Sequence, residues 1–155
     1  MVALRYVYVL ALAVWLGGMV VLGAIVAPTT FQVLERAMAG DLFGTVLARF
    51  HYISYGAAGT LLLTLVAMRL LGPRPPAFAF RAVLVIIMLG LALYSGIFVS
   101  GSIDDIQTQA GGLPSLLPVG HALRVRFDQL HTLSTRLMIA NIVGTLVLVY
   151  WEARD

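Results

Sequence analysis

The chain has 155 residues, of which 61% are hydrophobic and only 11% are charged, and its formal net charge is +3. Soluble domains carry about 25% charged residues, so this composition predicts an integral membrane protein. Every basic residue is an arginine and cysteine is absent, which excludes lysine Schiff-base catalysis, a cysteine nucleophile and thiolate metal sites. The arginines form no basic tract, so we expect no nucleic-acid partner.

Four apolar runs predict four membrane-spanning helices. A hydrocarbon core about 30 Å thick needs roughly 20 helical residues, and residues 6–27, 50–68 and 82–103 meet that length. The last uncharged run, residues 137–151, would extend only about 22 Å at 1.5 Å per residue, so the fourth helix must begin before Arg136. We therefore predict an all-α fold, an integral membrane four-helix bundle.

The bundle is expected to form one transmembrane domain over residues 1–155, with spans at about 5–27, 42–71, 79–104 and 121–152. The first run exceeds the 7–15 apolar residues usual in a signal peptide, so we expect it to be retained. Pro28 is expected to end the first helix, and residues 30–39 to form a short interfacial helix. Gly40 then breaks that helix, and Asp41 caps the second span.

Threading four spans divides the polar residues unequally between the two sides of the membrane. Residues 28–49 and 104–130 share one side, here called the histidine end, because all three histidines lie there or just inside it. The opposite side, here called the terminal end, carries both termini and residues 72–80. The loop on that side bears Arg69, Arg74 and Arg81 and no acid, which predicts cytoplasmic termini in a membrane of the bacterial inner type.

The fourth helix carries a polar stripe on one face. At about 100° per residue, the residues that share this face are His131, Ser134, Met138, Asn141 and Thr145. Unpartnered polar groups are costly in a bilayer, so the stripe should face other helices, a bound group or a wet cavity. Asn141 and Thr145 suit hydrogen bonds between helices. Arg136 lies about 180° from the stripe, and we expect it to snorkel outward or meet a neighbouring protein.

Two histidines are candidate ligands. His51, at the mouth of the second span, could approach His131 across the bundle, and such a pair can bind the iron of haem b or a copper-type ion. Asp128 and Met138 are further candidate metal ligands. The simpler interpretation is that both histidines form local hydrogen bonds, and that Arg124 and Asp128 form an i,i+4 ion pair where the helix enters the membrane.

Several short stretches resemble the transmembrane-protein-205-like family, four-span proteins classed as a domain of unknown function. The stretches are Trp15-Leu16-Gly17-Gly18, Ala27-Pro28 with Phe31, Ala39-Gly40, Arg49-Phe50-His51, and Phe127 to His131 with Ser134. The resemblance implies functional or packing roles for Trp15, Gly17, Gly18, Pro28, His131 and Ser134. Where that family often has an asparagine, four residues after the serine, this chain has Met138, and Asn141 follows one turn later.

The same Trp-Leu-Gly-Gly run is also similar to the first helix of copper-resistance D-type membrane proteins and of haem-binding protoporphyrinogen oxidases. Those proteins commonly carry a histidine two turns before the tryptophan, where this chain has Tyr8, and the oxidases rely on a lysine. We therefore expect a non-catalytic accessory or assembly subunit that binds other membrane subunits, or further copies of itself, through the polar histidine end. The alternatives are haem or metal binding or transport by His51 and His131, and an oligomeric efflux protein.

Overall fold

The computed structural model describes residues 2–72 and 76–154, and those residues include four helices long and apolar enough to cross a membrane. This confirms the predicted all-α, four-helix membrane bundle. In chain order the elements are α1 (Val2–Val21), the π-helix η1 (Leu22–Val26), α2 (Ala27–Val33), α3 (Arg36–Leu71), α4 (Phe78–Leu93), the π-helix η2 (Tyr94–Val99), α5 (Ser100–Ala110), the 3₁₀ turn η3 (Pro114–Leu116) and α6 (Ala122–Ala153).

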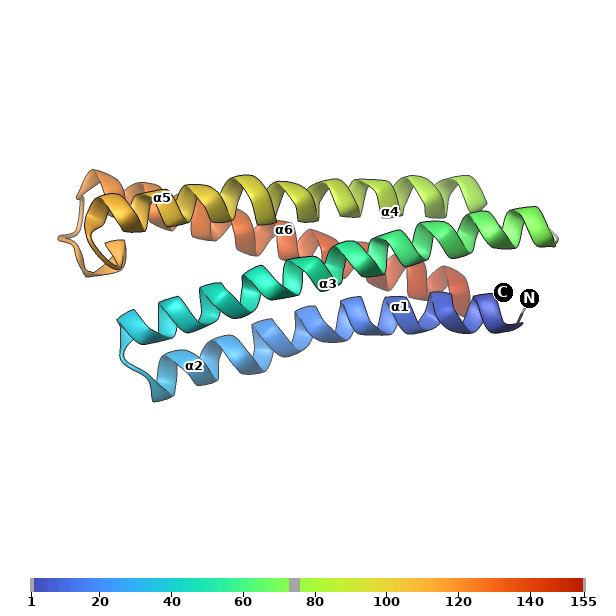
Figure 1. Cartoon of the computed structure of the whole chain (residues 1–155), viewed down its shortest axis with the longest axis horizontal. Coiled ribbons are helices and arrows are strands. Elements are labelled where there is room, and N and C mark those ends of the chain that lie inside the picture. Colours follow the sequence, from blue (N-terminus) through green and yellow to red (C-terminus); the bar gives the residue numbers. More distant parts are fainter. Residues whose placement is uncertain (1, 73–75, 155) are drawn as a thin grey trace.

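Eight of these nine elements form four long rods, and η3 lies in the loop between α5 and α6. The first is α1–η1–α2, the second α3, the third α4–η2–α5 and the fourth α6. Both chain ends lie at the terminal end, whereas α2 and α5 lie at the histidine end (Figure 1). α1 packs on α3 and α6, and α4 packs on the same two helices, so α3 and α6 occupy opposite corners of a four-membered ring.

The core is built from one face of each rod. Its buried side chains recur three or four residues apart, which places them on a single side of a helix. The main ones are Tyr8, Leu12, Trp15 and Met19 on α1, Ala58, Leu61 and Leu65 on α3, Val85, Met88 and Ala92 on α4, and Leu148 on α6. The outward faces are also apolar, with Leu63, Ile87 and Val143 exposed, as expected where helices contact lipid.

The connection between the first two spans differs from the sequence prediction. Pro28 does not end the first helix, because the π-helix η1 precedes it and the Ala27 N–H donates to the carbonyl of Leu22, five residues back. The wider turn accommodates a proline, which lacks an N–H and crowds the preceding helical turn. The short helix present is therefore α2, which continues the first rod, and the break falls at Leu34 in extended conformation.

The predicted break at Gly40 and the predicted cap at Asp41 are wrong, because both residues lie inside α3. The glycine has a packing role instead: a Cβ atom at position 40 would lie 2.9 Å from Cδ2 of Leu113, in the loop between α5 and α6. Gly40 thus allows that loop to approach α3 closely.

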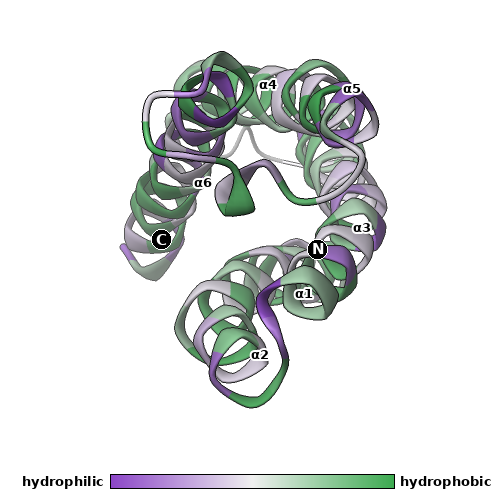
Figure 2. Ribbon diagram, turned by 90° about the vertical axis from the view of Figure 1, so that its left-hand side faces the viewer, coloured by the Kyte–Doolittle hydropathy of each residue, from purple (hydrophilic) through white to green (hydrophobic). Residues whose placement is uncertain are grey.

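The helices extend beyond the membrane at the histidine end. α3 has 36 residues, about 54 Å at 1.5 Å per residue. The hydrocarbon core accounts for about 30 Å, or roughly the interval from Arg69 to Arg49, so the rest of α3 lies at the histidine end. Hydrophilic segments gather at the near ends of α5 and α6 in the view along the bundle (Figure 2).

At this end the ring opens and a loop folds over it. α2 packs on η1 and α3 and diverges from α6 (Figure 2). The loop after α5 turns back through Gly111 and Gly120, whose positive φ angles suit glycine, and it places Pro114 in a buried position. The Arg124 guanidinium donates to the carbonyl of Leu117 at 2.7 Å, which holds the loop against α6.

Candidate functional site

The polar stripe of α6 is buried at its deep end and exposed at its outer end. Thr145 and Asn141 are buried, Met138 packs against Gly23 of η1, Ser134 is half-buried and His131 is exposed. This decrease in burial along the stripe follows from the opening of the ring. The first rod no longer covers this face of α6 once α2 diverges.

The two deep members of the stripe do not form the expected bonds between helices. The Thr145 hydroxyl donates to the carbonyl of Asn141 in its own helix at 2.7 Å. Asn141 is only 4% exposed, and its Oδ1 atom accepts no hydrogen bond from the part of the chain that the structure describes. A buried acceptor left open in this way costs about 1–3 kcal/mol.

His51 lies on the core-facing side of α3. Its Nδ1 atom is 2.9 Å from the carbonyl of Leu47, so Nδ1 carries the proton and Nε2 is left as an acceptor. The ring packs against η2, where a Cβ atom at Gly96 would lie 2.8 Å from Cδ2 of His51. Tyr55 lies next to the same glycine and donates weakly to the carbonyl of Ala92 at 3.5 Å.

His131 has a different environment. Its ring stacks on Phe127 of the same helix, with ring centroids 6.2 Å apart and an interplanar angle of 10°. Asp128 is exposed, and the predicted ion pair with Arg124 does not form, because Arg124 instead binds the carbonyl of Leu117. Within residues 2–72 and 76–154 the structure contains no group of three or more His, Asp or Glu side chains that could hold a metal ion.

The small-residue motif of the first helix is only partly used for packing. Trp15 is buried in the core, and a Cβ atom at Gly18 would collide with the ring of Phe50 on α3. Gly17 is exposed and has open space around it, so it allows no close approach of helices. The predicted packing role of Gly17 therefore has no contact within the described residues and stays a prediction.

The terminal end holds a buried charge network that the sequence analysis did not find. Glu152 accepts from Arg5 through Oε1 and from Arg81 through Oε2, the latter at 3.0 Å. The two arginines also donate at 2.8 Å to the carbonyls of Glu152 and Trp151, respectively. Arg81 is only 1% exposed.

The network joins three helices at the terminal end. Arg5 lies in the first turn of α1, Arg81 lies in the first turn of α4, and the carbonyls they bind belong to the last turn of α6. Cations at the C-terminal end of a helix are favourable because the last carbonyls lack partners within the helix. The network therefore closes the bundle at the end opposite the one where it opens.

Aromatic side chains and further arginines surround this network. The Arg69 guanidinium lies 4.9 Å from the ring centre of Phe78, and the Arg154 guanidinium lies 5.5 Å from that of Trp151. Trp151 also packs against Phe80, with ring centroids 6.0 Å apart. Aromatic residues with arginines are typical of the membrane–water interface, which indicates where the bilayer ends on this side.

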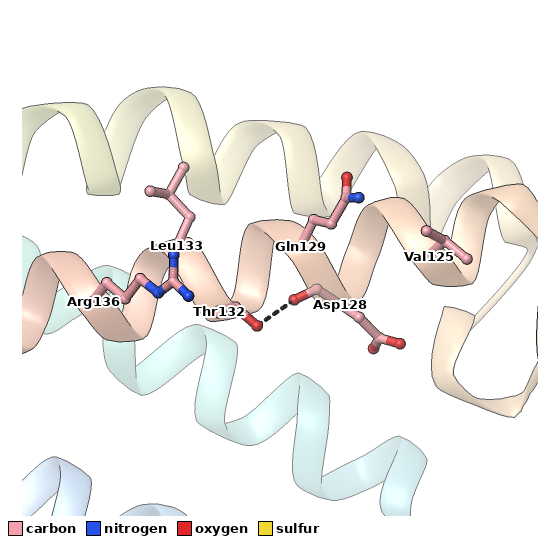
Figure 3. A pocket seen from close by; sticks show the side chains of 6 residues that line it. All are labelled: Val125, Asp128, Gln129, Thr132, Leu133 and Arg136. Atoms are coloured by element: carbon pink, nitrogen blue, oxygen red, sulfur yellow. Dashed lines mark hydrogen bonds between the residues drawn. The ribbon is translucent and has the colours of Figure 1, made fainter.

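An open depression of about 490 Å³ lies on the outward face of α6. Its lining residues all belong to that helix: Val125, Asp128, Gln129, Thr132, Leu133 and Arg136 (Figure 3). Arg136 therefore faces away from the bundle interior. Its guanidinium extends along the helix toward Thr132, in the direction of Asp128 (Figure 3).

Local sequence patterns could not reveal the charge network. Arg5 and Glu152 are 147 positions apart, so their pairing depends on the tertiary fold. One signal was present: Arg5, Arg81 and Glu152 each lie three or four residues from a buried core residue, namely Tyr8, Val85 and Leu148. Each of the three charges thus continues the core stripe of its helix.

Comparison with known families covers most of the chain. Residues 10–112 match the family described as a domain of unknown function, DUF4149. No curated protein and no solved structure matches the chain. The matched segment begins in α1, ends just after α5 and includes both π-helices and His51. Because it spans more than half of the sequence, the chain belongs to the DUF4149 family.

Proposed function

We propose that the protein is a non-catalytic accessory or assembly protein that binds another membrane protein through the histidine end. One observation carries the proposal. All the buried residues of α6 lie between Asn141 and Glu152, so within residues 122–140 the face that carries His131 and Ser134 offers contact surface that this chain does not fill. The second half of the same helix is buried by α1 and α4, whereas the first half packs on α5, η2 and η3 without any of its residues becoming fully buried.

Two apolar side chains beside the first half of α6 strengthen the proposal. In the loop between α5 and α6, Leu116 is 64% exposed and Val119 is 89% exposed. The loop is held in place by the buried Pro114 and by the bond between Arg124 and Leu117, so these apolar groups have fixed positions. An apolar patch on a polar surface is typical of a protein contact site, and these two exposed side chains lie three residues apart in one loop.

The placement in the cell is part of the same proposal. Arg69 and Arg154 lie at the terminal end beside Arg5 and Arg81, which together neutralise Glu152. The positive-inside rule then supports cytoplasmic termini in a bacterial-type inner membrane, with the partner on the opposite side. The Trp15–Gly18 run and Ser134 also support the proposal that the chain is related to the transmembrane-protein-205-like family.

Photo-crosslinking in cells tests this function. A photoreactive amino acid at Val119 should give one discrete protein adduct, and the same residue at Ile87, an exposed position in the middle of α4, should give none. Replacing the neighbouring Leu116 by aspartate should reduce the Val119 adduct while leaving the amount of protein in the membrane unchanged. Equal labelling at Val119 and Ile87, or an adduct insensitive to Leu116→Asp, would count against a specific partner.

Haem or metal binding is the second candidate, because the His51 Nε2 atom, on the inner face of α3, forms no hydrogen bond with the described residues and can act as a ligand. It has less support, since His131 is exposed and Asp128 lines the outward depression rather than the interior. The protein purified from cells decides between the two. A Soret band or stoichiometric copper that is lost in His51→Ala would favour this candidate over partner binding.

A further inference from the structure

The depression on α6 contains two charges without ion-pair partners. Neither the Asp128 carboxylate nor the Arg136 guanidinium forms an ion pair within residues 2–72 and 76–154. Both side chains are exposed, and they line the same open surface. They lie eight residues apart, which is about 12 Å along a helix.

The depth of these two residues matches the membrane interface. Arg136 is 16 residues from Glu152, so it lies about 24 Å from the charge network at the terminal end. It is therefore just inside a hydrocarbon core about 30 Å thick, and Asp128 is just outside it. Side chains on a helix lean toward its N-terminus, which for α6 is the histidine end, so Arg136 extends toward the lipid headgroups.

The same arrangement occurs a second time in the chain. Asp128, Thr132 and Arg136 on α6 are spaced four residues apart, and Asp41, Thr45 and Arg49 repeat this pattern on α3. All six side chains are exposed. In each copy the threonine hydroxyl donates to the backbone carbonyl of the aspartate, at 2.8 Å on α6 and 2.9 Å on α3.

The two copies lie at the same level of the bundle. α3 and α6 both run from the histidine end to the terminal end of the bundle. On each helix the next arginine along the chain lies close to the terminal end. Arg49 precedes Arg69 by 20 residues, and Arg136 precedes Arg154 by 18, so the two intervals are about 30 Å and about 27 Å. The two Asp-x3-Thr-x3-Arg segments therefore meet the same lipid leaflet.

We propose that these two segments are headgroup sites for zwitterionic phospholipids. In such a lipid the phosphate lies next to the acyl chains and the ammonium group lies further out. The arginine of each segment, which is the deeper residue, binds the phosphate, and the aspartate, two turns further out, binds the ammonium group. Each segment has no net charge, which complements a zwitterion and disfavours a lipid whose headgroup carries only a negative charge.

Alternative occupants fit the two segments less well. A second copy of the chain packed along α6 in the same orientation would place arginine opposite arginine, and like charges at close range are unfavourable. A free phosphate ion would be attracted to Arg136 but repelled by Asp128 of the same depression. The lipid satisfies both charges at once.

Native mass spectrometry of the full chain tests the proposal. The purified protein is titrated with phosphatidylethanolamine or phosphatidylglycerol carrying identical acyl chains. We expect two tightly retained phosphatidylethanolamine molecules and weaker retention of phosphatidylglycerol. Arg136→Gln and Arg49→Gln should each weaken one of the two sites about fivefold, because an arginine near a membrane surface contributes about 1 kcal/mol.

The aspartates and a control arginine make the test specific. Asp41→Asn combined with Asp128→Asn should reduce or abolish the preference for phosphatidylethanolamine over phosphatidylglycerol. Arg126→Gln is the control, because Arg126 is exposed on α6 but does not line the depression. This substitution should change neither the number of retained lipid molecules nor the preference for phosphatidylethanolamine. Equal retention of the two lipids by the unmodified protein, or equal losses in Arg126→Gln and Arg136→Gln, would overturn the proposal.

Discussion

Removing the carboxylate of Glu152 should be among the most destabilising single changes in this protein. Glu152 binds both Arg5 and Arg81, and Arg81 is almost fully buried. In Glu152→Ala, Arg81 retains its bond to the carbonyl of Trp151 but loses its bond to the carboxylate of Glu152. Breaking a buried ion pair by removing one partner typically costs about 3–5 kcal/mol, so we expect a loss of that size.

The ion pair between Arg5 and Glu152 provides a comparison within the same network, because its arginine is partly exposed. The Arg5 side chain is 46% exposed, so water can solvate Glu152 when Arg5 is shortened. Exposed ion pairs contribute about 0–1 kcal/mol, so Arg5→Ala should cost several-fold less than Glu152→Ala. Replacing Arg81 and Glu152 together by leucine removes both charges, and should therefore cost less than Glu152→Ala alone.

Reversible unfolding in mixed detergent micelles measures these differences. The fraction of sodium dodecyl sulfate at the midpoint, followed by helical circular dichroism or tryptophan fluorescence, gives the free energy of unfolding for each variant. The expected order of stability is the unmodified protein, then Arg5→Ala, then Glu152→Ala. A midpoint for Glu152→Ala equal to or above that of Arg5→Ala would refute the role assigned to the buried carboxylate.

Three further substitutions probe the packing of the bundle in the same unfolding assay. Gly96→Ala should cost about 1–3 kcal/mol, because its methyl group would displace the rings of His51 and Tyr55. The matched control Gly17→Ala has open space and should be neutral or stabilising by up to about 1 kcal/mol; destabilisation as large as that of Gly96→Ala would contradict the assigned contacts. Asn141→Leu should be neutral or stabilising by about 1 kcal/mol, since it removes an acceptor that has no donor among the described residues; a large loss of stability would show that Oδ1 is satisfied in the membrane.

The four spans could be predicted from the sequence because bilayer thickness imposes a minimum length on each apolar run. The position of the turn after the first span could not. Pro28 usually ends a helix, but a single wide turn at η1 lets the chain continue to Val33. Gly40 looked like a helix breaker, and its actual role depends on Leu113, a residue distant in the sequence.

The candidate site was less predictable than the fold. Helical periodicity identified the face of α6 that carries Asn141 and Thr145, and these residues are buried. An argument from periodicity assumes that neighbouring helices pack on a helix along its whole length. α6 does not meet this assumption, because its buried residues lie only in its second half. The divergence of α2 leaves His131 exposed, although it shares a face with Asn141. The network around Glu152 depends on contacts between helices far apart in the sequence.

The central claim is that the histidine end is covered by a partner in the native membrane. The chain contains no cysteine, so single cysteines at Val119 and at the control position Val33, which is 75% exposed at the end of α2, can be labelled without background. Labelling rates with a membrane-impermeant maleimide are compared in native membranes and in purified protein returned to liposomes. The account predicts that Val119→Cys reacts several-fold more slowly in native membranes, and that Val33→Cys reacts at the same rate in both. Equal rates for Val119→Cys in the two preparations would contradict it.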